Sequence, residues 1–518
     1  MIGRLLVVAT AVFGLTACST DSVGPIKAPF AANLSLNASS VPGSYIIMAR
    51  GKAAATLADE VAKLGGTLTF YHAATGFASV SGLTSAAALQ LKGVGGVTDV
   101  ESDILVGLDA PSATVQADAS ALLGADADPA PVPGTGIPEA ALLGSWQWDM
   151  QLIRADKAWA KSKLGSDKVT VAIIDTGLDY DNRDLNTLVD LTRSASFANS
   201  WVGGDTTTLN NPHPDTLTIS DAEITATRFP TRNPIQDYNG HGTNVGATVS
   251  SRAFAFAGVT AKTKLIGVKV LGRNGQGNFS QILSGVLFAA DNHADVANMS
   301  LGGAFSKAGS GRLVGIINQV LNYTQRQGML IVTSAGNDGR DMKQNGNTFV
   351  SFCDAPHVVC VTAVGPKTWE GNRDVPAFYT NYGLGVATVA APGGNGVLLS
   401  DGTLKPSDGW PWGAPPNGTS IASAVWSFCT RTKMNIVGKT GAFGNLVRDP
   451  DCARGASLTG AIGTSQAAPH VAGLAALIIA EKGKLSPRTL KQLIMDSSDP
   501  LNPLLGRGRI NVQTALGL

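Results

Sequence analysis

From Trp146 onward, the sequence alternates short apolar segments with longer segments of helical periodicity. The helical segments include 280–290 and 311–327, and the apolar segments lie at 169–174, 265–270, 296–299, 329–333 and 358–364. Short buried strands that alternate with helices are typical of a mostly parallel sheet covered by helices. The sequence therefore predicts an α/β fold for residues 146–518.

A smaller unit is predicted at 43–108. Strand-like segments lie at 44–49, 67–71, 76–80 and 97–106, and helix-like segments at 53–64 and 85–91. This β-α-β-β-α-β order is typical of a small ferredoxin-like α+β domain. Residues 109–145 are rich in Ala, Asp, Pro and Gly, a composition that predicts a flexible linker between the two units.

The first 42 residues indicate export. Residues 1–17 combine one arginine, an apolar run and small residues, as a secretory signal does, and are too short to span a bilayer permanently. The run L-T-A-C ending at Cys18 resembles the lipobox of bacterial lipoproteins, whose cysteine becomes lipid-modified. In an ordinary signal peptide Cys18 would be incidental. Residues 18–42 are then a tether, and the expected location is secreted, periplasmic or lipid-anchored at the envelope of a bacterial cell.

The net charge and the cysteine positions limit which partners, metal sites and disulfides the sequence supports. Lys and Arg number 39 against 38 Asp and Glu, a net charge of +1 that gives no support to a nucleic-acid partner. Membrane contact is expected only through the possible lipid anchor. The cysteines lack C-x-x-C metal spacing. Of three possible pairings among the four after Cys18, an oxidising compartment and short spacing favour Cys353–Cys360 with Cys429–Cys452.

Three motifs carry the candidate chemistry. The run V-A-I-I-D-T-G ends a strand with Asp175, at the sheet edge where open α/β folds place their sites. The run N-G-H-G-T carries His241 between two glycines, ahead of a helix-like segment. The run G-T-S-Q-A-A-P-H-V-A-G carries Ser465 at the start of a long apolar helix, where orphan N–H groups stabilise an oxyanion. Taken singly, the first two motifs have a plainer interpretation as a turn cap and a surface-turn histidine.

In the order Asp, His, Ser, the motifs resemble the subtilisin-like (subtilase, S8-type) serine peptidases. The resemblance covers 146–518 and includes N-M-S-L-G-G at 298–303 and T-S-A-G-N-D-G at 333–339. Residues 43–108 resemble, with less specific motifs, the inhibitory pro-segment of that family. The resemblance implies a subtilisin-like three-layer fold with a mostly parallel central sheet, preceded by a ferredoxin-like pro-domain. It also implies a monomeric serine endopeptidase that acts on proteins or peptides and is inhibited by its own pro-segment.

The resemblance and elementary chemistry assign roles. Ser465 attacks the peptide carbonyl, His241 accepts its proton, and Asp175 orients the imidazole. Asn337 is implied as the oxyanion donor, although on its own it would be a turn residue beside glycine. Phe279 would line a pocket for an apolar side chain or, alternatively, pack in the core. Two edges would hold an extended substrate as an added strand, and their residues are Gly275, Gly277 and Phe279 on one side and Ser300, Leu301 and Gly302 on the other.

Some features depart from the family pattern or compete with the assignment. Ser420 lies in a second G-T-S run but lacks the P-H-V-A-G continuation, which favours Ser465. Insertions at 186–236 and 394–459 are either surface decoration or a modified substrate rim. Asp184 matches a family calcium ligand, but the calcium loop after the histidine helix is missing. No metal ligand is predicted, structural calcium stays unassigned, and the chemistry requires no cofactor.

Two other function classes are less consistent with these motifs. A non-catalytic exported binding lipoprotein on the subtilase scaffold would be favoured by loss of a triad residue, and all three are present. A lipase or esterase would carry G-x-S-x-G and the order Ser, Asp, His. The sequence therefore predicts a secreted or lipid-anchored serine endopeptidase made as a self-processing zymogen.

Overall fold

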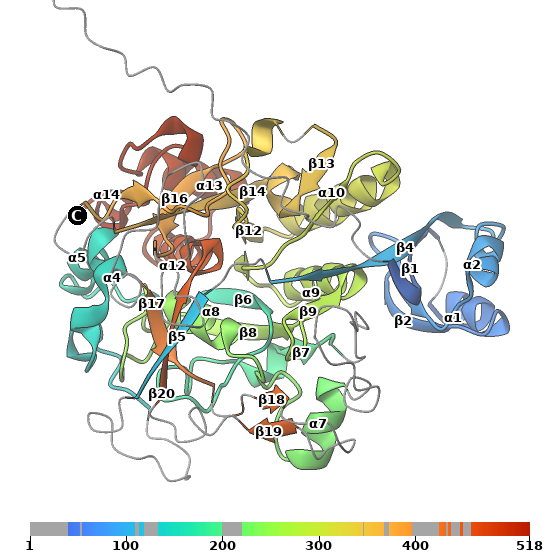
Figure 1. Ribbon diagram of the computed structural model, residues 1–518, viewed down its shortest axis with the longest axis horizontal. Helices are drawn as coiled ribbons and strands as arrows, with labels where there is room; N and C mark the ends of the chain where they lie inside the picture. Colours follow the sequence, from blue (N-terminus) through green and yellow to red (C-terminus); the bar gives the residue numbers. More distant parts are fainter. Residues whose placement is uncertain are drawn as a thin grey trace, which may run out of the picture.

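The computed structural model (Figure 1) describes most of the chain. The described residues are 40–51, 54–108, 113–118, 133–198, 220–344, 346–366, 372–395, 424–430, 432, 434–436, 446–448 and 457–518. Predictions for the signal peptide, Cys18, Ser420 and Cys452 fall outside these ranges. Within them, the structure contains no helix with the length and apolar character needed to cross a membrane.

A mostly parallel sheet forms the centre of the main body. In the described part of the chain its strand order is β15-β14-β12-β10-β6-β8-β7, with β16 paired to β14, and β15 alone runs antiparallel to its neighbour. The five predicted strands are confirmed. The strands are β6 (Thr170–Asp175), β7 (Ala195–Ser196), β8 (Lys264–Lys269), β10 (Val296–Met299), β12 (Leu330–Ser334), β14 (Val358–Gly365), β15 (Val375–Pro376) and β16 (Val389–Pro392).

Helices cover both faces of this sheet. In β6, Val171 and Ile173 join the apolar cluster of α8 and α12, whereas Ala172 and Ile174 join that of α9 and α10. The alternation buries β6 on both sides, as expected for a parallel strand between two helical layers. The predicted three-layer α/β arrangement is confirmed. The main helices are α8 (His241–Val249), α9 (Phe279–Asp291), α10 (Gly311–Arg326), α12 (Thr464–Lys482) and α13 (Pro487–Asp496).

Smaller elements complete the main body. The short helices are α4 (Trp148–Leu152), α5 (Ala155–Trp159), α7 (Asp221–Arg228) and α14 (Val512–Leu516), and the 3-10 turns are η1 (Pro138–Ala140), η2 (Gly144–Trp146), η3 (Leu191–Arg193), η4 (Met342–Gln344), η5 (Ser351–Asp354) and η6 (Pro503–Leu505). The peripheral strands are β5 (Ala113–Asp118), β9 (Gln276–Asn278), β11 (Ala304–Ser306), β13 (Thr348–Val350), β17 (Val425–Phe428), β18 (Met434–Ile436), β19 (Leu446–Arg448) and β20 (Ser457–Ile462).

An antiparallel sheet forms the N-terminal unit, drawn in blue in Figure 1. Its elements follow the predicted order, with strand order β2-β3-β1-β4. They are β1 (Ser40–Ala49), α1 (Ala54–Lys63), β2 (Thr67–His72), β3 (Phe77–Ser81), α2 (Ser85–Leu91) and β4 (Val97–Gly107). Leu57 and Val61 of α1 pack in one buried cluster with Ile47 and Val80 of the sheet. The longest strand, β4, continues past this sheet and pairs with β9 of the main body.

The segment 133–145 differs from the flexible linker that its composition predicted. It contains the turns η1 and η2, and the backbone of Gly134 bonds to that of Arg183 at 3.1 Å. Leu143 is 3% exposed, and its N–H donates to the Ala255 carbonyl at 2.9 Å. Backbone hydrogen bonds and one buried leucine fix this segment despite its proline and glycine content.

Both insertions contribute to the body of the protein. In the first, Asp221 of α7 forms ion pairs with Lys269 and Arg273, and all three side chains are buried. In the second, β17 is buried and Phe428 stacks on Phe254 at 6.1 Å between ring centroids. The interpretation of these described parts as surface decoration is therefore wrong.

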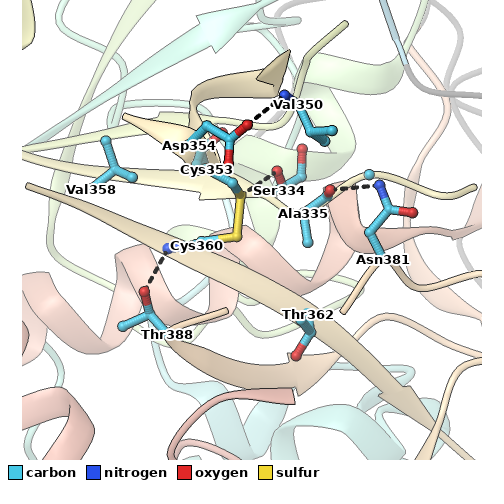
Figure 2. The surroundings of a disulfide bond; sticks show 12 residues. Ser334, Ala335, Val350, Cys353, Asp354, Val358, Cys360, Thr362, Asn381 and Thr388 are labelled. Carbon is cyan, nitrogen blue, oxygen red and sulfur yellow. Dashed lines mark hydrogen bonds between the residues drawn. A yellow bond between two sulfur atoms is a disulfide. The ribbon is translucent and has the colours of Figure 1, made fainter. Parts of the chain in front are cut away.

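One predicted disulfide is confirmed. Cys353 of η5 and Cys360 of β14 are bonded in a buried cluster beside Ala335, as Figure 2 shows. The N–H of Cys360 also donates to the Thr388 hydroxyl at 3.1 Å. Cys429 is disulfide-bonded as well. Its pairing with Cys452 stays a prediction because Cys452 lies outside the described residues.

Candidate active site

Asp175 and His241 form the most direct contact between candidate catalytic residues. Asp175 is the last residue of β6 and is fully buried, and His241 is the first residue of α8. Nδ1 of His241 lies 2.8 Å from Oδ1 of Asp175, which also accepts the Thr176 N–H at 2.7 Å. Because an ionised carboxylate only accepts hydrogen bonds, Nδ1 carries the proton, and Nε2 is the ring nitrogen that can act as a base.

Glycines on both sides of His241 allow this contact. Gly240 has φ +106°, a conformation that L-residues with a Cβ rarely adopt. A Cβ on Gly242 would lie 2.2 Å from the Gly177 carbonyl oxygen and 3.2 Å from the Asp175 Cβ. The glycines of N-G-H-G-T are therefore required for α8 to dock on the end of β6.

Asp237 organises the turn before His241, a role that none of the three sequence motifs indicated. Its Oδ1 accepts the Asn239 and Gly240 N–H groups, each at 2.9 Å, and the Thr176 hydroxyl at 3.0 Å. Its Oδ2 accepts the N–H and hydroxyl of Thr243 at 3.0 and 2.6 Å. One buried carboxylate thus ties the Asp motif to the His motif. The available signal was an aspartate four residues before the histidine.

Burial raises the pKa of Asp237, although the buried Lys269 ammonium opposes this shift. Lys269 lies beside Asp175 in the register of β6 and β8, and its Nζ donates to the Thr176 carbonyl at 2.5 Å. The Lys269 side chain also forms the ion pair with Asp221. The first insertion therefore supplies a charge that compensates a buried cation next to Asp175.

Ser465 is the second residue of α12 and is 1% exposed. Its hydroxyl donates to the Ser300 carbonyl at 3.2 Å, and the Ser300 hydroxyl donates to the Ser465 carbonyl at 2.7 Å. Helix α12 packs against α8, where the Gln466 amide lies 3.5 Å from Oδ1 of Asn244. The packing of these two helices brings the serine and histidine motifs to the same edge of the sheet.

Asn337 lies in the loop after β12 and is fully buried. Its Oδ1 accepts both the N–H and the hydroxyl of Thr464, each at 2.8 Å, and the Gly336 N–H donates to the Thr464 hydroxyl at 3.1 Å. Thr464 therefore fixes the plane of the Asn337 amide next to Ser465. Thr464 lies in the G-T-S run, but nothing in that motif distinguished its role from that of Ser465.

Asn381 supports the Asn337 loop from behind. Its side-chain amide donates to the Ala335 carbonyl at 2.9 Å (Figure 2), and its Oδ1 accepts the N–H groups of Asp338 and Arg340 at 3.1 and 2.8 Å. The Cys353–Cys360 disulfide lies on the other side of Ala335. Nothing in the sequence around Asn381 indicated this role.

The end of β4 occupies the space between the two expected substrate edges. On one side, residues 105–107 pair antiparallel with 276–278, and the Leu108 N–H donates to the Gly275 carbonyl at 2.9 Å. On the other side, the Gly302 N–H donates to the Gly107 carbonyl at 3.3 Å. The two edges thus hold residues of the N-terminal unit as an added strand.

Phe279 fits both interpretations that the sequence left open. It is 4% exposed, stacks on Phe352 with ring centroids 5.7 Å apart, and meets Phe305 edge-on at 6.2 Å. The same buried cluster contains Leu301 and Val106 of β4. Phe279 is therefore a core residue whose cluster also takes up an apolar side chain from the bound strand.

Comparison with known proteins agrees with this geometry. Residues 166–515, well over half of the chain, match the model of the Subtilase family. Subtilisin DY from Bacillus licheniformis is 28% identical over 372 residues, which are 71% of this chain and 97% of that protein. Alkaline elastase YaB from Bacillus sp. (strain YaB) is 30% identical over 328 residues, 63% of this chain and 70% of that protein.

The chain belongs to the subtilase family. It is a subtilisin-like serine endopeptidase, and its substrates are proteins or peptides.

Solved structures agree on the fold. The epidermin leader peptide processing serine protease (EpiP) from Staphylococcus aureus has a TM-score of 0.59 and 20% identity, over 92% of this chain and 98% of that one. Fervidolysin from Fervidobacterium pennivorans has a TM-score of 0.58 and 17% identity, over 92% of this chain and 61% of that one. At these identities the likeness concerns the fold alone.

Asp184 of this subtilase does not fit a calcium site. Its carboxylate accepts three backbone N–H groups, those of Phe254, Ala255 and Phe256, at 2.6, 3.1 and 3.2 Å. Oxygens surrounded by N–H donors are poorly arranged for a cation that needs six to eight oxygen ligands. Burial raises the pKa of Asp184 to about 7, although these hydrogen bonds oppose the shift. Among the described residues, no cluster of His, Cys, Asp and Glu could hold a metal ion.

Proposed function

We propose that this subtilase is a secreted or lipid-anchored endopeptidase, made as a zymogen that processes itself. Support for the triad comes chiefly from the 2.8 Å contact between His241 Nδ1 and Asp175 Oδ1, with Ser465 on the neighbouring helix. Support for the zymogen comes from the end of β4, which lies between the two substrate edges.

The proposed reaction proceeds through an acyl-enzyme. Ser465 Oγ attacks the scissile carbonyl carbon while Nε2 of His241 takes the hydroxyl proton. Collapse of the tetrahedral intermediate breaks the C–N bond, and His241 returns the proton to the leaving amine. Water then attacks the ester by the same steps and restores Ser465. Asp175 holds the imidazole and stabilises its protonated form, and no step uses a cofactor.

The negative oxygen of the intermediate requires hydrogen-bond donors that are already in place. We assign this role to the Asn337 amide together with the Ser465 backbone N–H at the start of α12. Thr464 and Asn381 then act as positioning residues. Because they hold the loop before substrate arrives, little reorganisation is needed when the charge develops.

The zymogen proposal locates the first cut. Leu108 is bonded to Gly275 on one side of the active site, and Ala113 pairs with Ile462, three residues before Ser465, on the other. The peptide bond that reaches Ser465 should therefore lie within residues 108–113. Tethering raises the effective concentration of this bond to about the millimolar range, which favours an intramolecular cut.

After the cut, residues 43–108 would remain as an inhibitor. Asp103 of β4 is fully buried and accepts the Ser280 N–H at the start of α9 at 3.0 Å, and the Ser44 hydroxyl donates to it at the same distance. His72 lies 3.1 Å from Asp291, and the Gln319 amide donates to the Thr75 carbonyl at 2.6 Å. These contacts outside the groove support a folded pro-domain that stays bound until it is degraded.

Export is proposed from the signal-like residues 1–17. If Cys18 is lipid-modified, the anchor would hold the pro-segment, and the cut would release the protease from the membrane. Inhibition by the bound pro-segment would protect the producing cell during export.

Expression of wild type beside Ser465→Ala tests the proposal, with Ser420→Ala as the matched control. Wild type and Ser420→Ala should yield a fragment that begins within 109–113 and should digest casein. Ser465→Ala should remain a single signal-processed chain without activity. Full-length wild type that digests casein would disprove the zymogen, and identical fragments from all three would mean that another protease cuts.

The pH dependence tests the role of His241. Activity should rise with pH between about 5 and 8, because only the neutral imidazole accepts the Ser465 proton. The measurement is kcat/KM for a peptide under conditions where acylation limits the rate. A profile that stays flat across this pH range contradicts the mechanism.

A further inference from the structure

An additional strand leads directly into the nucleophile. β20 (Ser457–Ile462) is followed by Gly463 and then by α12, which carries Ser465. One edge of β20 pairs with β17, and the other pairs with β5 over six residues, from Ser457 opposite Asp118 to Ile462 opposite Ala113. The strands β17, β20 and β5 form a sheet of their own, and Figure 1 shows them within the main body near α8.

Residues 113–118 occupy the edge of β20 that faces away from β17, and they form a stretch of extended chain located after the expected cut. Residues 105–108 lie on the edges formed by β9 and Gly302, and residues 113–118 lie on β20. These two described stretches of the same polypeptide therefore lie on different binding edges, and only residues 109–112 separate them in the sequence. Strand pairing uses main-chain groups, so an edge that takes residues 113–118 can take other extended sequences.

The three-stranded sheet is also connected to the histidine helix. Asn244, three residues after His241 in α8, donates from its amide to the carbonyl of Val425 in β17 at 3.3 Å and to that of Thr459 in β20 at 3.5 Å. Its Oδ1 lies 3.5 Å from the Gln466 amide, next to Ser465. A strand added to β20 therefore extends a sheet that is held against both catalytic helices.

We infer that the edge of β20 that faces away from β17 is a binding site for the leaving-group side of the substrate. Its ligand is an extended polypeptide segment that begins a few residues after the scissile bond and adds to β20 as an antiparallel strand. In the precursor, residues 113–118 occupy this site. The inference rests on the proposed function, because it needs the cut to lie between residues 108 and 113. It makes the protease selective for cleavage sites that have several residues of extended chain on their C-terminal side.

The test uses synthetic peptides from the chain's own junction. Peptides of residues 103–112, 103–115 and 103–120 share the same residues before the cut and differ only after it. The value of kcat/KM should rise by about 10-fold or more between the shortest and the longest, since several backbone hydrogen bonds are added at a modest net gain each. An equal rate for all three peptides, both with this enzyme and with the variant described below, overturns the inference and leaves the peptidase function intact. Failure to cleave any of the peptides or casein overturns the proposed function.

Proline substitutions in the longest peptide provide a matched control. In an edge strand, adjacent residues direct their N–H groups alternately toward the partner strand and away from it. Of two peptides carrying Val115→Pro or Gln116→Pro, one should lose most of the gain and the other should keep most of it. Equal loss in both would mean that general contacts, and not strand pairing, produce the length effect.

The enzyme's own residues 113–118 remain attached to it after the cut and can compete for β20. The series is therefore repeated with a full-length variant in which residues 113–118 are replaced by alternating glycine and serine. A length effect in either enzyme supports the site, and a larger effect in the variant shows competition by the native segment. Absence of the effect in both enzymes overturns the inference.

Discussion

The two edges that hold the chain on either side of the active site are built differently. Both edges lie within residues 166–515, which match the Subtilase family. The edge before the cut consists of β9 and residues 300–302, which correspond to motifs of that family. The edge after the cut is β20, a six-residue strand whose partner β17 lies in the insertion 394–459. In the proposed function, the first edge fixes where a peptide bond meets Ser465. In the further inference, the second edge adds selectivity for the residues on the C-terminal side of that bond.

If the inferred binding site on β20 is used, this difference shows how a common catalytic centre acquires a new substrate requirement. The triad and Asn337 lie on elements that the central sheet and its helices position. The insertion 394–459 contributes β17, which pairs with β20 just before α12 begins, and the elements that carry the triad and Asn337 lie outside this insertion. Because strand addition depends on backbone groups, a new subsite of this kind needs few specific side chains.

The largest effect is expected from a change that lowers kcat equally whether or not the substrate fills the second edge. Asn337→Ala should lower kcat by about 10²–10³-fold with little change in KM, the size found when one oxyanion donor is removed in subtilisin itself. The loss should be the same for the short and long junction peptides, since the oxyanion forms after both edges are filled. A wild-type kcat in the variant would show that Asn337 is only a turn residue.

A charge at Val106 should weaken the edge before the cut. Val106 is buried in the cluster with Phe279 and Leu301, so Val106→Asp in the junction peptide should lower kcat/KM by about 10–100-fold through lost apolar burial and a desolvated carboxylate. Leu105→Asp, on the opposite and half-buried face of the strand, is the control and should cost less. If both cost the same, the Phe279 cluster does not take up the substrate side chain.

Substitution of Asp221 in α7 should change the edge before the cut more selectively, because Asp221 forms ion pairs with residues that precede β9. Arg273 lies two residues before Gly275 and shares Asp221 with Lys269. Asp221→Asn leaves two buried cations with a neutral partner, which should loosen this loop and raise KM several-fold for peptides that include residues 105–108. The gain from residues 113–118 should persist. A loss of that gain as well would mean that the two edges do not act independently.

The Asp184 carboxylate binds the backbone of residues 254–256, which belong to neither edge, so its substitution should have the smallest effect on cleavage. With its pKa raised to about 7, the folded state retains a proton that the unfolded chain has lost, so the free energy of unfolding should fall as the pH rises from about 4 to about 7. Denaturant unfolding of Ser465→Ala, with and without Asp184→Asn, measures this. The Asn variant should lack the slope, and identical pH profiles would contradict the raised pKa.

The sequence predicted more of this protein than local propensity alone would allow. The alternation of apolar strands and helices located the five main strands of the central sheet, because a buried parallel strand leaves an uninterrupted apolar run. The motif order located Asp175, His241 and Ser465, which the structure places at one end of that sheet. The glycines around His241 were also informative, since a Cβ on Gly242 would collide with the Asp motif.

Features that depend on distant partners were not predictable in this way. The buried carboxylate of Asp237 binds residues of two motifs, and Asn381 braces a loop more than 40 residues earlier. The proline-rich and glycine-rich segment 133–145 suggested a flexible linker, yet hydrogen bonds to residues 183 and 255 fix it. Composition carries no information about such partners.

Local pattern thus determined which segments form strands and helices and which side chains carry the chemistry, because those properties arise within a few residues of sequence. The tertiary structure alone decided that α7 supplies a charge beside the Asp motif and that residues 113–118 pair with β20. Each of these contacts joins segments separated by more than 40 residues, and main-chain hydrogen bonds or buried charges hold them together. Such contacts produce no periodic pattern in the sequence.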